Sequence, residues 1–216
     1  MMKPVFAITG RLLAGNIVSY IITAAIVIFA VSSGDIVISN GNYTWLLALL
    51  SPFFFVFHDF KKLIHIGACK KDYFISSLLS YGILASLISL LNALIHTVID
   101  PLYGTRSVIN LMDVCGWTDN GIIIAFLQQA FFLMLVMTFL HVILSMQTKW
   151  YGWLTDIMLI AVICIFTPFA PLRSLLAGFF RIIMINSNAL MQIFVSVFLT
   201  ILLSLTGVLI LKKRTL

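Results

Sequence analysis

Glutamate is missing from this chain of 216 residues, in which all seven acidic residues are aspartates. Its absence excludes enzymes that work with paired glutamates inside a membrane. Charged residues are also scarce, at 9%, whereas 62% of the residues are hydrophobic and the mean hydropathy is +1.16. A soluble domain cannot bury so much apolar surface, so we expect lipid to be the solvent for most of the chain.

Cysteine is rare as well, and Cys69, Cys115 and Cys164 are too few and too far apart for a disulfide framework. The chain contains neither the G-x-x-x-x-G-K-[ST] motif that cradles nucleotide phosphates nor a G-x-S-x-G nucleophile elbow. The net charge of +6 comes from short basic clusters at the ends of apolar runs. Such clusters are typical of membrane topology signals, so we expect no nucleic-acid partner. We also expect no metal or cofactor in this chain.

Long uncharged runs are what the sequence does have. A bilayer core of about 30 Å requires roughly 20 helical residues, and continuous apolar runs favour helices over a barrel. The runs predict an all-α polytopic protein with one domain, residues 1–216, and six transmembrane helices. These spans cover approximately residues 12–31, 43–58, 74–99, 122–148, 153–172 and 188–211.

The basic residues predict that both termini are cytoplasmic. With this orientation, ten of the 13 basic residues lie inside, and Arg106, Arg173 and Arg181 lie outside. The ten are Lys3, Arg11, Lys61, Lys62, Lys70, Lys71, Lys149, Lys212, Lys213 and Arg214. This excess satisfies the positive-inside rule and predicts a multi-pass protein of the plasma membrane.

An amphipathic helix is predicted between the fifth and sixth spans. Apolar residues recur there at helical spacing, at Leu172, Leu175, Leu176, Phe179, Phe180 and Ile183, and Arg173 and Arg181 share the opposite face. We expect this helix to lie in or dip into the outer leaflet. The alternative is an ordinary connector packed on the helix bundle.

A second short helix is predicted in the cytoplasmic loop 58–73, where Phe60, Leu63, Ile64 and Gly67 form a narrow apolar face. An exposed apolar face would need a cytoplasmic partner. Alternatively, the lysines of this loop only enforce topology. The candidate contact residues are Asp59, Phe60, Lys61, Lys62, Leu63, Ile64, His65, Ile66, Gly67, Lys70 and Lys71.

Polar side chains inside the spans are costly without partners, and therefore mark places to look for function. Asn92, Gln128, Gln129 and Gln192 are candidates for a substrate path, although interhelical hydrogen bonding is the favoured explanation for them. The aromatic residues Phe53 and Phe54 are further candidates, and lipid contact is their alternative role.

This arrangement resembles the permease subunits of type-2 ATP-binding-cassette exporters. In that family, residues 3–11 would be the amphipathic elbow helix, residues 59–69 the coupling helix and residues 172–188 the outer hairpin. Residues 66–74 (IGACKKDYF) are similar to the start of the third span in small permeases from Gram-positive bacteria.

The resemblance implies a permease dimer, with an identical or a different second subunit, that works with separate cytoplasmic ATPase subunits binding ATP and Mg²⁺. The substrates that it implies are hydrophobic or amphipathic molecules, with antimicrobial peptides and phenol-soluble modulins as examples. Two alternatives stay open. One is a channel or secondary transporter without an ATPase. The other is a membrane cysteine peptidase using His65 and Cys69, which lie one helical turn apart.

Overall fold

The computed structural model describes residues 2–30, 36–104, 107–147, 149–186 and 188–213. Val31 and Thr148, where two predicted spans end, lie outside these residues, as do Arg106 and Arg214. The helices are α1 (Met2–Gly15), α2 (Ile17–Phe29), α3 (Asn40–Tyr43), α4 (Trp45–Phe54), α5 (Phe60–His65), α6 (Lys70–Leu94), α7 (Leu111–Val114), α8 (Ile122–Met146), α9 (Trp150–Phe166), α10 (Ala170–Ile183) and α11 (Ala189–Lys213). The π-helical turns are η1 (Phe55–Asp59) and η2 (Ile95–Ile99), the 3₁₀ turns are η3 (Asp100–Tyr103) and η4 (Thr118–Asn120), and the strands are β1 (Ile36–Ile38) and β2 (Ser107–Ile109).

The all-α class is confirmed, and the structure supports the prediction of a membrane protein. Four continuous helices are long and apolar enough to cross a membrane, at 40–65, 70–103, 122–146 and 189–212. Two further helix pairs, α1 with α2 and α9 with α10, pass the same test only as bent pairs, and bring the number to as many as six. The predicted spans 74–99 and 122–148 correspond closely to α6 and α8, because both are uninterrupted apolar runs bounded by polar residues.

The first predicted span is bent by 44° between α1 and α2, at Asn16. The amide of Asn16 donates to Ser51 Oγ of α4 at 2.8 Å, and its Oδ1 accepts from Ser19 Oγ at 2.6 Å. Residues 3–11, expected as an elbow helix, belong to α1. That helix packs along α6, where Ser76 Oγ donates to the Val5 carbonyl at 3.0 Å.

The second span does not end at residue 58 as the sequence predicted, because α4, η1 and α5 form one continuous helical segment to His65. Pro52 lies inside α4 and has no N–H for the helix ladder. Shortly after it, the chain widens into η1, where the amide of Phe60 donates to the Phe55 carbonyl. The hydroxyl of Tyr73 donates to the same carbonyl at 2.7 Å, which fastens the wide turn to α6.

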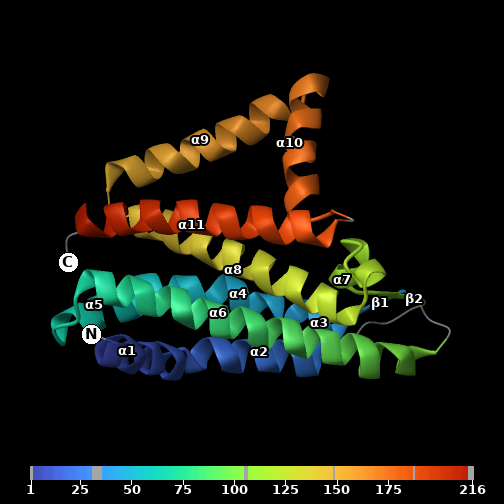
Figure 1. The fold of residues 1–216 in the computed structure, drawn as a ribbon, viewed down its shortest axis with the longest axis horizontal. Coiled ribbons are helices and arrows are strands. Elements are labelled where there is room, and N and C mark those ends of the chain that lie inside the picture. The colour runs from blue at the N-terminus through green and yellow to red at the C-terminus, as the bar shows by residue number, and fades with distance from the viewer. Residues whose placement is uncertain (1, 31–35, 105–106, 148, 187, 214–216) are drawn as a thin grey trace.

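α8 lies at the centre of the bundle, in contact with α4, α6 and α11 (Figure 1). On α6, the small residues Ser76, Ser77, Ser80 and Ser89 are fully buried, which allows neighbouring helices to approach closely. Large aromatic rings fill the half of the bundle nearer α5, where the rings of Phe55 and Tyr81 stack with their centroids 5.3 Å apart.

One end of the bundle carries the starting residue of α1, the end of α11 and α5, and the opposite end carries β1, β2 and α7 (Figure 1). The two strands, which the sequence analysis did not predict, pair in parallel with Val37 opposite Val108. They join two loops that are separated by the whole of the second and third spans. This pairing connects the two loops at the end of the bundle that carries β1 and β2, which we call the strand end.

The chain bends by 120° between α9 and α10, and these two helices stand away from the other helices (Figure 1). The predicted span 153–172 is therefore broken after Phe166, and the prediction of an amphipathic helix after it agrees with α10. Gly152 is the buried residue of α9, and most of the remaining side chains are exposed.

We expect Gly152→Ala to destabilise the turn between α8 and α9. A Cβ at this position would lie 2.3 Å from the backbone carbonyl oxygen of Met146, and a backbone atom cannot move aside as a side chain can. The expected loss is about 1–3 kcal/mol in free energy of unfolding, measured by thermal or denaturant unfolding in detergent.

The matched control is Gly178→Ala in α10, where nothing lies within 4 Å of the added Cβ. There, the better helix propensity of alanine should leave stability unchanged or raise it. Equal effects of the two substitutions would contradict the close approach at Gly152.

Candidate functional site

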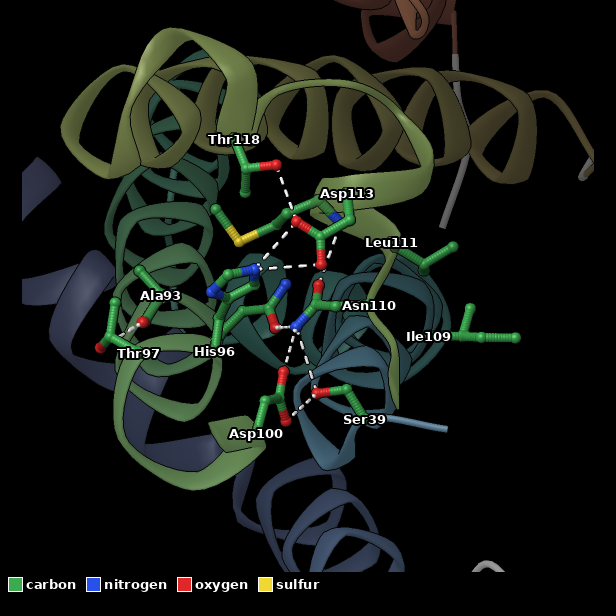
Figure 2. Close-up of polar contacts among 12 residues, drawn as sticks. Ser39, Ala93, His96, Thr97, Asp100, Ile109, Asn110, Leu111, Asp113 and Thr118 are labelled. Atoms are coloured by element: carbon green, nitrogen blue, oxygen red, sulfur yellow. Dashed lines mark hydrogen bonds and ion pairs between the residues drawn. The ribbon is translucent and has the colours of Figure 1, made fainter. Parts of the chain in front are cut away.

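A buried polar cluster joins the two loops at the strand end of the bundle (Figure 2). Its centre is Asn110, which follows β2 and whose side-chain amide donates to Ser39 Oγ, Asn92 Oδ1 and Asp100 Oδ2, each at 3.1 Å. Ser39 Oγ in turn donates to Asp100 Oδ1 at 2.8 Å. We call Ser39, Asn92, Asp100 and Asn110 the outer polar cluster.

Local structure places each member of the outer polar cluster. Ser39 follows β1 and caps α3, accepting from the Gly41 amide, and Asn110 caps α7 in the same way through the Met112 amide. Asp100 begins η3, near the end of the long helical segment 70–103 that starts with α6. Both capping residues are serine or asparagine, whose short side chains suit helix N-termini.

The outer polar cluster reaches into the membrane bundle through Asn92. Its amide donates to Gln129 Oε1 of α8 at 3.3 Å, so four elements share one chain of hydrogen bonds. α3 lies close to these hydrogen bonds: a Cβ on Gly41 would lie 1.9 Å from Asn92 Oδ1, so any larger residue would force the Asn92 side chain to move. All four cluster members are at least nine-tenths buried, which makes unsatisfied groups here costly.

A second set of polar contacts lies at the rim of the cluster. His96 Nε2 pairs with Asp113 Oδ1 at 2.9 Å, and Thr118 Oγ1 donates to the same oxygen at 2.7 Å (Figure 2). These side chains are partly exposed, so the pair contributes less than a buried one would. The rim contacts hold α7 and η4 against the end of the third span.

The predicted path residues fall into two hydrogen-bonded groups. Asn92 and Gln129 belong to the group described above, whereas Gln128 donates to Gln192 Oε1 and accepts from the Asn120 amide at 3.5 Å. Both groups form hydrogen bonds between helices, which is the role that the sequence analysis weighed against a substrate path. Phe53 is half-exposed on the outside of the bundle beside Phe57, with ring centroids 4.8 Å apart, which is typical of lipid contact.

Another polar pair is buried among the aromatic rings in the half of the bundle nearer α5. The hydroxyl of Tyr81 lies 2.6 Å from His141 Nδ1, and the rings of Tyr73 and Phe74 pack against the same imidazole. This pair joins α6 to α8.

At the end of the bundle where α1 begins, the structure corrects the expected apolar face of loop 58–73. Phe60 is 1% exposed and Leu63 5% exposed, because both pack into the bundle, with the Phe60 ring 5.1 Å from that of Tyr73. Asp59 is buried as well and Ile64 is half-buried. The surface that α5 leaves open consists of Lys61, Lys62, His65, Ile66 and Gly67, and Ile66 is 61% exposed.

The remaining predicted residues lie on the surface. Lys71 is exposed and Lys70 half-exposed at the start of α6. On α10, Arg173, Phe179, Phe180 and Arg181 are all exposed, so the apolar side of this helix is open to lipid.

The chemistry available at the proposed peptidase residues is limited. His65 and Cys69 are both exposed, and within the described residues no hydrogen bond joins them and no acid orients the imidazole. Among all the residues that the structure describes, no group of three or more His, Cys, Asp or Glu side chains could hold a metal ion.

Comparison of the chain with protein-family models, curated proteins and solved structures finds no match. The family resemblance therefore stays a prediction.

Of the outer polar cluster, sequence reasoning singled out Asn92 but not Ser39, Asp100 or Asn110. A usable signal was the sequence Asp100-Pro101 at the end of an apolar run, followed by the capping residue Asn110 ahead of Leu111. The partner residue Ser39 lies 61 positions before Asp100, so no local pattern connects the two.

We expect Asn110→Asp to destabilise the protein at neutral pH by about 2–5 kcal/mol, because it replaces a donating amide with a carboxylate beside buried Asp100. The loss should shrink as the pH falls, since protonation of one carboxyl removes the repulsion and restores a donor. Unfolding between pH 5 and pH 8, compared with wild type, measures this. Asn188→Asp, at the exposed start of α11, is the control and should be neutral. A pH-independent loss would contradict this account.

We expect Cys115 to alkylate slowly near neutral pH, because burial raises the pKa of its thiol to about 11 and only the thiolate reacts. In a variant retaining Cys115 alone, the rate with iodoacetamide should climb steadily as the pH approaches that value. The same variant unfolded in detergent should react quickly at pH 8. If native and unfolded protein react equally fast at pH 8, the thiol is not buried.

Proposed function

We propose that this chain is the transmembrane permease subunit of an ATP-driven exporter in the plasma membrane. In this proposal, it crosses the membrane six times with both termini cytoplasmic, and the bent pairs α1 with α2 and α9 with α10 supply the first and fifth crossings. Separate ATPase subunits bind ATP and Mg²⁺, and a second permease subunit completes the transport path.

The distribution of charge between the two ends of the bundle supports this orientation. Lys61, Lys62, Lys70 and Lys71 lie at the end that carries the start of α1 and the end of α11 (Figure 1). Asp100, Asp113 and Asp119 belong to the loops at the other end. An excess of lysine at one end marks it as cytoplasmic.

The single observation that carries the proposal is the rigid connection between the exposed side of α5 and the interior of the bundle. The continuous helical segment 40–65, which includes α3, α4, η1 and α5, spans 26 residues, or about 39 Å, which exceeds a hydrocarbon core of about 30 Å. Because Lys61 and Lys62 lie on its exposed side, we place α5 at the end of this segment that projects from the membrane. Its buried side is held by Phe60 against Tyr73, whose hydroxyl also binds the backbone of η1.

If α5 is the coupling helix, it would contact the ATPase through a different side from the one that the sequence predicted. The apolar side of α5 binds its own bundle, and the basic side with Ile66 stays open for an ATPase. Force applied to Lys61 and Lys62 would pass through Phe60 and Leu63 to α6, and along α4 to the outer loops. Packed helices transmit such displacements because they deform little.

The substrate class rests on the family resemblance, which implies hydrophobic or amphipathic molecules moving outward. The exposed apolar sides of α9 and α10 would suit a path shared with a second permease subunit and lipid.

The proposal is tested by purifying the tagged chain from its native cells in mild detergent and assaying the preparation for bound ATPase. We expect an ATPase to copurify, and the double substitution Lys61→Glu with Lys62→Glu to lower its recovery at least about tenfold, since charge reversal at a contact opposes binding. Lys212→Glu, exposed at the end of α11 on the same side, is the matched control and should leave recovery unchanged.

Two results would overturn the proposal. One is a preparation in which no ATPase copurifies with the wild-type chain. The other is the same loss of ATPase with Lys212→Glu as with the double substitution.

A further inference from the structure

A pocket of about 360 Å³ lies at the strand end of the bundle, between the loop before α8 and the end of α10. One wall is formed by Cys115, Gly116 and Asp119, and the other by Arg181, Ile182, Ile185 and Asn186. This volume is at the small end of the range for ligand-binding pockets.

The two walls are held together by Trp117. Its indole Nε1 donates to the carbonyl of Met184 at 2.8 Å, and its ring is fully buried in stacking contact with Trp45, 6.1 Å between centroids. This contact joins the loop to the segment after α10. The pocket therefore has a fixed position relative to the bundle, although most of α10 stands away from the bundle.

Two opposite charges line the pocket without pairing. Asp119 comes from η4 on one wall and Arg181 from the last turn of α10 on the other. Within the described residues, neither side chain forms an ion pair or hydrogen bond with another protein group, and both are exposed. A carboxylate and a guanidinium on facing walls are complementary to a ligand that carries both charges.

We propose that this pocket binds the headgroup of a zwitterionic phospholipid with a primary ammonium, such as phosphatidylethanolamine. Arg181 binds the phosphate, for which the planar guanidinium offers paired donors. Asp119 accepts hydrogen bonds from the ammonium group.

The surroundings of the pocket favour a lipid over a soluble zwitterion. Ile182 and Ile185 line the pocket and are exposed, and the adjacent Phe179 and Phe180 of α10 are about half exposed. Ile182, Phe179 and Phe180 belong to the amphipathic helix α10 and Ile185 follows its end, so acyl chains would lie against this exposed apolar surface. A small soluble molecule would leave these residues uncovered.

The same surroundings determine the orientation of the ligand. In a phospholipid, the phosphate is nearer the acyl chains and the ammonium is at the far end of the headgroup. Arg181 belongs to α10, the helix that carries the apolar residues, and Asp119 belongs to the polar loop, so phosphate at Arg181 and ammonium at Asp119 is the matching order.

The test is native mass spectrometry of the purified full-length chain in detergent, titrated with phosphatidylethanolamine or with phosphatidylglycerol of the same acyl chains. We expect at least about tenfold tighter binding of phosphatidylethanolamine, because phosphatidylglycerol has no ammonium for Asp119. This readout does not depend on transport or on an ATPase.

Three variants and a control sharpen the test. Asp119→Asn should remove the preference between the two lipids, and Arg181→Gln should weaken binding of both. The charge exchange Asp119→Arg with Arg181→Asp should not restore binding, because a lipid cannot reverse its orientation. Arg173→Gln, which removes the same charge two turns earlier on α10 outside the pocket, should bind like wild type.

Three results would overturn the proposal. Equal binding of the two lipids by wild type would exclude recognition of the ammonium. Free phosphoethanolamine binding as tightly as the lipid would assign the pocket to a soluble zwitterion. Loss of thermal stability in each single variant without lipid, recovered by the charge exchange, would show that Asp119 and Arg181 simply pair with each other.

Discussion

A polar group inside a bilayer has no water to bind, so it must find its partner within the protein. This constraint explains why most of the chain is helical and why the exceptions are so well bonded. The hydroxyl of Tyr73 binds the carbonyl of η1, and the amide of Asn16 binds Ser51 at the bend between α1 and α2. At both of these irregularities, a side chain from a neighbouring helix lies beside the backbone.

The same constraint connects the membrane part to the loops. The outer polar cluster begins in the loops with Ser39 and Asn110 and continues through Asn92 to Gln129 in the bundle. Because one amide serves several acceptors, the two loops and two spans are stabilised together rather than separately. In the half of the bundle nearer α5, packed aromatic rings connect α5 to its neighbouring helices in a similar way.

The spans could be predicted because their signal is local. An uncharged run as long as α6 or α8 has one stable structure in lipid, and the run itself contains all the information needed. The amphipathic helix α10 was equally readable from residues three and four positions apart. The parallel pairing of β1 with β2 was not, since its partners are about 70 residues apart in the sequence.

The buried side of α5 was misread for a related reason. Residues 60–64 have the periodicity of an amphipathic helix, and this pattern shows which residues share a face but not what covers that face. In the structure Tyr73, from the next helix, covers Phe60. The bends at Asn16 and after Phe166 likewise depend on packing partners and turn geometry that hydropathy does not describe.

The wide turn η1 decides which side chains of α5 point outward. A π-helical turn accommodates one residue more than a regular α-helical turn at the same place. If residues 55–59 were wound as a regular α-helix, every later side chain of α5 would move round by one position. Phe60 would then take the exposed place of Lys61, and Lys62 would enter the buried place of Leu63. One surplus residue in the helix thus keeps an ammonium group out of the packed interior of the bundle and an aromatic ring within it.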